Sequence, residues 1–183
     1  MLIDIQRYPF SPVITRYQKL NMNRRKGNNF KNNLIDKGYI RAKEVKLSIG
    51  RIMLFELTEK GKQFLEKLGY PVCRDRNGVE HRFWKWKIAQ YYRKRGYKVF
   101  IEKRINGAVD VAVKKDNMSI AVEIETGKSD FMKNILTDLK AGYDMVISVA
   151  TDESIGDRIR QKLRAENLDR VRKISVTTVR AFE

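Results

Sequence analysis

Residues 118–125 read MSIAVEIE, and their apolar and polar side chains alternate with the period of a β-strand. The alternation puts the apolar side chains on one face and Glu123 and Glu125 on the other. At a rise of about 3.3 Å per residue, the two glutamates lie about 7 Å apart along the strand. We therefore expect a strand with one face in a core and two acids on its other face.

Another acid lies in the preceding Val-rich run, where Asp110 is costly to bury without a partner. Residues 108–114 predict a strand that pairs with 118–125 through a turn at Asp116 and Asn117. Three neighbouring carboxylates repel one another, and a divalent cation, Mg²⁺ or Mn²⁺, is the simplest counter-charge. The alternative is that these acids face solvent on an exposed sheet.

Further elements surround these two strands. A helix is expected over residues 80–95, ended by Gly96, and a strand over 97–104 with an Asn106-Gly107 turn after it. Downstream we expect a helix at 130–141, a strand at 143–150, a helix at 153–167 and a strand at 171–179. The order predicts an α/β sandwich around a central mixed sheet.

Turn-forming residues collect at 69–78, where the apolar periodicity stops, and they divide the chain into domains 1–72 and 73–183. In the first domain we expect a helix ending near Leu20, a helix between Asn23 and Gly38 with an apolar stripe that includes Phe30, a hairpin of strands at 39–47 and 52–57, and a closing helix capped by Thr58.

The order helix, turn, helix, hairpin, helix resembles the winged-helix family over nearly all of residues 1–72. The words LNMNRRKG (20–27), LIDKGYI (34–40) and LTEKG (57–61) look like those of archaeal and bacterial winged-helix modules. The resemblance implies DNA binding through cations and amides that contact phosphates and base edges. The candidates are Arg24, Arg25, Lys26, Asn28, Asn29, Lys31 and Asn32 on the second of these helices, and Arg51 in the hairpin. The alternative is a solvated helix face.

The second domain resembles the PD-(D/E)XK nuclease superfamily, with its restriction-endonuclease-like fold, over about residues 79–151. The stretch EIETGKS (123–129) looks like the motif strand of resolvase-like and of plasmid- or virus-encoded members. The resemblance implies that Asp110 and Glu123 bind Mg²⁺, with Glu80 joining them from the first helix. Metal-bound water would then attack a phosphodiester.

Two positions depart from that family's pattern. Val109 replaces the motif proline, and Glu125 stands where the family usually has a lysine. Two replacements for the missing lysine are open. Lys128 can reach back into the site, or Glu125 can accept a proton from water as a general base.

The triplet after the motif strand, Gly127-Lys128-Ser129, is similar to the end of a P-loop, but Val122 occupies the place of the first P-loop glycine, so no nucleotide cofactor is expected. We expect Ser129 instead to cap the next helix, whose N-terminus would hold a DNA phosphate. Residues 82–104 contain nine basic residues and one acid, so Lys85 is expected to line the same nucleic-acid track.

Composition limits the partners. Lys and Arg number 39 against 22 Asp and Glu in 183 residues, a net charge of +17. Both parts share the excess, with 15 basic and 6 acidic residues in 1–70 (+9) and 24 and 16 in 71–183 (+8). This favours nucleic acid as partner over a membrane surface. The single Cys73 and the lack of a long apolar run favour a cytoplasmic protein.

Together these features predict a Mg²⁺-dependent endonuclease, of a virus, plasmid or mobile element, that a winged helix directs to double-stranded or branched DNA. Many relatives of the nuclease fold dimerise to cut two strands, so a homodimer is compatible with the resemblance. One alternative is a non-catalytic DNA-binding regulator or replication or recombination accessory that keeps the nuclease fold as a scaffold. Another is an RNA-processing nuclease with the same chemistry.

Overall fold

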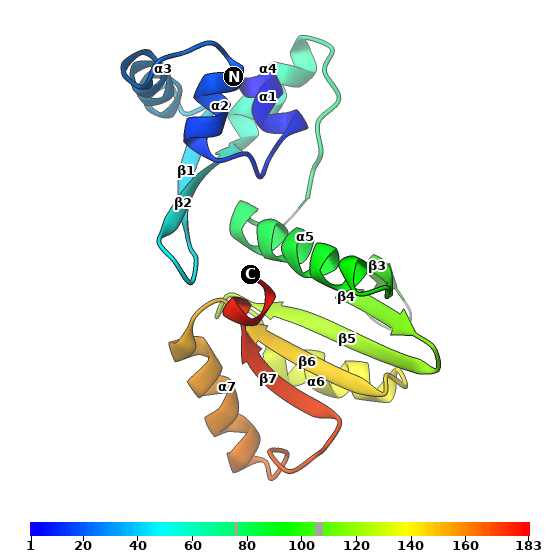
Figure 1. Ribbon diagram of the computed structural model, residues 1–183. Coiled ribbons are helices and arrows are strands. Elements are labelled where there is room, and N and C mark those ends of the chain that lie inside the picture. Colours follow the sequence, from blue (N-terminus) through cyan, green and yellow to red (C-terminus); the bar gives the residue numbers. More distant parts are fainter. Residues whose placement is uncertain (76, 105–107) are drawn as a thin grey trace. The chain divides into compact units, whose positions relative to one another are not determined.

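The computed structural model describes residues 1–75, 77–104 and 108–183 (Figure 1). It divides into two compact units, Met1–Arg82 and Phe83–Glu183. The expected domain boundary after residue 72 lies before this division, because the first turn of the helix Val79–Lys94 belongs to the first unit. The Asn106-Gly107 turn lies outside the described residues.

The first unit contains a short helix, two further helices, a hairpin and a closing helix. Their bounds are α1 Leu2–Arg7, α2 Val13–Lys19, α3 Arg24–Asp36, β1 Ile40–Lys46, β2 Arg51–Leu57 and α4 Glu59–Lys67. The two strands pair antiparallel, from Ile40 opposite Leu57 to Lys46 opposite Arg51. The expected order is found, and α1 is an addition that the sequence pattern did not reveal.

Side-chain caps mark the starts of α3 and α4. The Asn23 side chain accepts a hydrogen bond from the Lys26 backbone N–H at 2.9 Å, and Thr58 accepts one from Gly61 at 3.1 Å. Gly38 follows α3 with φ +70°, a left-handed conformation that favours glycine. These three boundary expectations are confirmed.

Helices α2 and α3 meet at a glycine. A Cβ on Gly27 would lie 2.5 Å from the ring of Tyr17, so only glycine allows this approach. Tyr17 belongs to a buried cluster that joins the helices to the hairpin, together with Ile5, Leu34, Ile40, Phe55, Leu57 and Leu65. The contact fixes how α3 packs on the rest of the unit.

The second unit is built on a five-stranded mixed sheet. Its elements are α5 Val79–Lys94, which begins in the first unit, β3 Lys98–Arg104, β4 Ala108–Lys115, β5 Met118–Glu125, α6 Phe131–Lys140, β6 Met145–Ala150, α7 Glu153–Ala165, β7 Ile174–Thr178 and the 3₁₀ helix η1 Val179–Phe182. The strand order is β3-β4-β5-β6-β7, antiparallel up to β5 and parallel from β5 to β7. The α/β class and the central mixed sheet are thus as expected.

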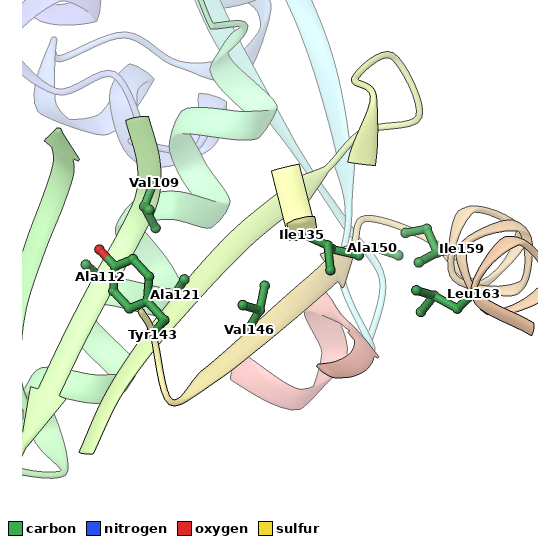
Figure 2. Packing of buried hydrophobic residues seen from close by; sticks show 9 residues of the cluster. All are labelled: Val109, Ala112, Ala121, Ile135, Tyr143, Val146, Ala150, Ile159 and Leu163. Carbon is green, nitrogen blue, oxygen red and sulfur yellow. The ribbon is translucent and has the colours of Figure 1, made fainter. Parts of the chain in front are cut away.

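Helices α6 and α7 connect the parallel strands and share one core with them. Figure 2 shows Ile135 of α6 and Ile159 of α7 in the same buried cluster as Ala121 of β5 and Val146 of β6. The interior strand β5 is buried from Ile120 onward, which is typical of a strand covered on both faces. No helix of the described residues is long and apolar enough to cross a membrane.

Candidate functional site: a buried carboxyl cluster

The acids of β4 and β5 interlock where the backbone pairing of these strands ends. This pairing runs from Lys115 opposite Met118 to Val111 opposite Val122. Beyond it, the Asp110 backbone N–H donates to Glu123 Oε1 at 3.3 Å, and the Ile124 N–H donates to Asp110 Oδ2 at 3.0 Å. Each carboxylate therefore accepts a hydrogen bond from the neighbouring strand, which holds the two side chains together.

Helix α6 adds a third carboxyl that the sequence reasoning missed. Asp138 is 4% exposed, and a hydrogen bond with the Glu123 carboxyl favours its charged form. The available signal was its position three residues after Ile135, which puts it on the buried face of α6. An acid on that face needs a partner in the sheet, and Glu123 is that partner.

The cluster holds a proton under neutral conditions. Burial raises the pKa of Glu123 to about 10, and the charges of Asp110 and Asp138 add to the effect. Burial also raises the pKa of Asp138, to about 6. The site therefore contains more carboxyl groups than its surroundings can keep ionised, which is common at catalytic and metal-binding sites.

One cation of the cluster comes from α5. The Lys85 Nζ lies 3.3 Å from Asp110 Oδ1, and the Lys85 side chain is only 6% exposed. Lys85 was expected on a surface track that binds nucleic acid. The structure instead buries it beside Asp110, because α5 turns this side of the helix toward the protein interior.

Glu125 is the most buried acid of the site, at 1% exposed. Its carboxylate accepts hydrogen bonds from the Ser129 hydroxyl and, at 3.3 Å, from Asn134 Nδ2. The expectation that Ser129 caps the following helix is wrong. Asp130 is the N-cap of α6 and accepts from the Lys133 N–H at 3.1 Å, while Ser129 is bound to Glu125. Glu125 thus ties the turn after β5 to α6.

Glu80 and Lys128 are the two other residues that were expected in the site. Glu80 forms an ion pair with Lys43 of β1 at 2.8 Å, within the first unit. Lys128 is exposed in the turn before α6. Their expected roles in metal binding and catalysis stay predictions.

Several buried polar atoms near Glu123 have no hydrogen-bond partner among the described residues. They are Asp138 Oδ2, the Tyr143 hydroxyl and Ser148 Oγ. Ser148 is the residue of β6 paired in register with Glu123. The pKa of Tyr143 is raised by burial and then by the charges of Asp138 and Glu123. Unsatisfied buried oxygens around an acid suit a water molecule or a hard cation.

The donor chemistry of the cluster fits Mg²⁺, but the side chains do not yet point to one centre. Within residues 1–75, 77–104 and 108–183, no three or more His, Cys, Asp or Glu side chains are grouped so that they could hold a metal ion. Asp110 faces Lys85 and the Ile124 N–H. Metal binding at this cluster would therefore require the carboxylates to rotate away from these partners.

A second candidate surface lies on α3. Arg24, Arg25, Lys26, Asn29 and Asn32 are exposed, and Lys31 is partly exposed. Asn28 is partly buried because its Oδ1 accepts a hydrogen bond from the Tyr17 hydroxyl at 3.2 Å. In the hairpin, Arg51 is 73% exposed and pairs with Glu44 at 3.2 Å.

The exposed face of α3 also contains a groove. It is lined by Asn23, Arg25, Lys26, Asn29, Phe30 and Asn33. Phe30 was expected in the apolar stripe of this helix, but it is 47% exposed. Gly27 and Leu34 face the core instead, and Phe30 lies to one side of the line that they form.

Comparisons with models of protein families, with curated proteins and with solved structures found no match to this chain.

Proposed function

We propose that the chain is a metal-dependent DNA endonuclease of the PD-(D/E)XK type, whose first unit acts as a winged-helix module that holds duplex or branched DNA. The observation that carries this proposal is that Asp110, Glu123 and Asp138 lie close enough to interact within one buried cluster. If all three carboxyls were ionised, their negative charge would exceed the single positive charge of Lys85. A hard divalent cation is the usual counter-charge for such a set of oxygen donors.

The residues that would hold the ion are Asp110 and Glu123, with Asp138 as an additional oxygen donor. Mg²⁺ or Mn²⁺ bound there supplies the activation of water and the stabilisation of the leaving oxygen. The Lys85 ammonium, 3.3 Å from Asp110 Oδ1, would remain beside the site after that carboxylate rotates toward the ion. Glu125 stands where the nuclease family usually has a lysine, and Lys85 provides a positive charge in place of that lysine.

Glu125 is a positioning residue in this proposal. Its buried carboxylate accepts hydrogen bonds from Ser129 and Asn134 and so holds the turn between β5 and α6. A base at Glu125 would have to leave these donors before it could take a proton from water. Lys128, which is exposed at the same turn, is free of this constraint and is the better candidate to contact a DNA phosphate.

Support for DNA as the substrate comes from the first unit. Its element order resembles a winged helix, and α3 exposes three consecutive cations at residues 24–26. The net charge of +17 is shared by both parts of the chain. A polyanion is the partner that such charge attracts.

The test is nicking of supercoiled and branched DNA by the full chain in Mg²⁺ or Mn²⁺, with RNA as a parallel substrate. Asp110→Asn and Glu123→Gln should each lower the cleavage rate by at least roughly a hundredfold and leave DNA affinity unchanged. Asp157→Asn on α7 is the matched control, because it removes an exposed carboxylate whose ion-pair partner is Arg160, also on α7. Cutting that survives both substitutions in the cluster would exclude this site.

The second candidate function is a DNA-binding protein without catalysis, as a regulator or a replication or recombination accessory. It is favoured by the Lys85–Asp110 ion pair, which already balances one carboxylate, and by the lack of a ready metal group among the described residues. It predicts salt-sensitive DNA binding and no nicking with either metal ion. The same assay distinguishes the two functions.

A further inference from the structure

The exposed groove of α3 combines three kinds of side chain. Asn29 and Asn33 lie one helical turn apart, on the same side of the helix, and Phe30 lies beside them. All three line the groove, together with Arg25 and Lys26. The surface therefore offers primary amides, an apolar ring and positive charge within two turns of one helix.

The amides define what this surface can recognise. An asparagine side chain donates through its NH2 group and accepts through its carbonyl oxygen at the same time, and in the major groove adenine offers the matching acceptor N7 and donor N6. At 1.5 Å rise per residue, Asn29 and Asn33 are about 6 Å apart along the helix axis. This separation is within reach of base pairs that stack about 3.4 Å apart.

The exposed ring points to the other half of the same base pair. Phe30 leaves 47% of its surface exposed, so its ring is accessible for an apolar contact. The thymine methyl group is the apolar feature of the major groove. Adenine and thymine edges lie side by side in each A·T pair, so Asn29, Phe30 and Asn33 together suit A·T pairs better than G·C pairs.

The charges around the groove fit the phosphates that flank such a site. Residues 24–33 read RRKGNNFKNN and contain four cations and no acid. The first three cations occupy the first turn of α3, at one end of the amide-bearing face. A helix with its attached side chains fits the width of the major groove, where its end meets the backbone.

We propose that the α3 groove recognises A·T base pairs in the major groove of duplex DNA, with Asn29 and Asn33 on adenine edges and Phe30 on a thymine methyl group. Arg25 and Lys26 contact phosphates and contribute affinity without base preference. The inference rests on the DNA-binding part of the proposed function and is independent of metal-dependent cleavage.

The experiment selects binding sites from random-sequence duplex DNA with the full chain in EDTA, so that no cleavage intervenes. The expected result is enrichment of adjacent A·T pairs. Asn29→Ala and Asn33→Ala should each lower the affinity for the selected site by roughly tenfold or more. Neither should change the weaker affinity for an alternating G·C duplex. Gln63→Ala is the control, since it removes an exposed amide from α4 in the same unit.

A change of preference is a sharper result than a loss, because misfolding cannot produce it. Asp accepts but does not donate, and cytosine N4 is the donor that suits it. Repeating the selection with Asn29→Asp should therefore replace an A·T pair by a G·C pair at one position, with cytosine facing residue 29. Arg25→Gln should weaken binding to selected and unselected sequences equally.

Four outcomes would overturn the inference. Binding without base preference, or a G·C-rich selected site, removes the A·T assignment and leaves the proposed nuclease intact. A selected site whose affinity is unaffected by Asn29→Ala and Asn33→Ala moves recognition to another surface. Failure of the wild-type chain to bind any duplex in EDTA removes both the inference and the DNA-targeting role of the first unit.

Discussion

Arg16 in the first unit and Glu123 in the second are both buried ionisable side chains, but their surroundings differ. Arg16 pairs with Asp4 and donates from Nη2 to the backbone carbonyls of Tyr8, at 2.7 Å, and Ser11, at 3.2 Å. Glu123 instead lies among other carboxyls, and its pKa is raised. A buried charge with opposite charge and carbonyls around it serves the fold. A buried acid among acids costs stability, which points to a functional use.

Removing the Arg16 guanidinium should have the largest effect on stability. Arg16→Met leaves Asp4 and two carbonyls without their donor, so the free energy of unfolding should fall by about 3 to 5 kcal/mol. Urea denaturation of the full chain, followed by circular dichroism, measures this loss. The double variant Arg16→Met/Asp4→Leu should recover part of it, because the Asp4 carboxylate is then no longer left without its partner, while the carbonyls of Tyr8 and Ser11 still lack their donor. An unchanged unfolding curve for the single variant would contradict the structural role of the pair.

Glu123→Gln should act in the opposite direction in the absence of metal. The folded pKa of Glu123 is about 10, above the ordinary value, so the folded protein keeps a proton that the unfolded chain has lost. Above the ordinary glutamate pKa, wild-type stability should therefore fall with rising pH, by about 1.4 kcal/mol per pH unit for one proton, until the pH passes the folded pKa.

Glutamine removes this pH dependence. Between pH 6 and pH 8, the variant should gain about 2 to 3 kcal/mol of stability relative to wild type. Urea denaturation in EDTA at the two pH values measures the difference. Glu153→Gln, at an exposed carboxylate of α7, should show no such change. Parallel behaviour of Glu123→Gln and wild type over this range would show that Glu123 is ionised when folded.

Metal binding should release the proton that the cluster holds. If Mg²⁺ is bound by ionised Asp110 and Glu123, binding near pH 7.5 should release about one proton. Calorimetric titration in buffers of different ionisation enthalpy counts this proton. The Glu123→Gln variant should release no proton when Mg²⁺ is added. The Arg16–Asp4 ion pair should not contribute to the proton release. Mg²⁺ binding whose heat is independent of the buffer would place the ion at another site.

The predictable parts of the fold are those with a local cause. Alternation in residues 118–125 predicted β5, and the polar caps Asn23 and Thr58 predicted the starts of α3 and α4. Gly38 and Gly96 both have positive φ, as expected of residues that end helices. These signals act within a few residues of chain, so no tertiary information was needed.

The site itself was only partly predictable. The acids of β4 and β5 were found because two paired strands bring them together. Lys85 and Asp138 were not assigned to it, because each comes from a helix whose rotation over the sheet is set by packing. Ser129 was predicted wrongly as the cap of α6. Its hydroxyl donates to Glu125 instead, and the neighbouring Asp130 caps the helix.

The hydrogen bond from the Ile124 N–H to Asp110 Oδ2 makes the Asp110 side chain part of the sheet as well as of the proposed site. The Asp110 carboxylate takes the place of a backbone acceptor between β4 and β5, so Asp110→Ala would remove a hydrogen bond of the sheet together with the carboxylate of the site. Asparagine at position 110 retains an oxygen for this hydrogen bond while discarding the negative charge. Asp110→Asn is therefore the variant that tests the loss of the charge while it preserves the structure of the sheet.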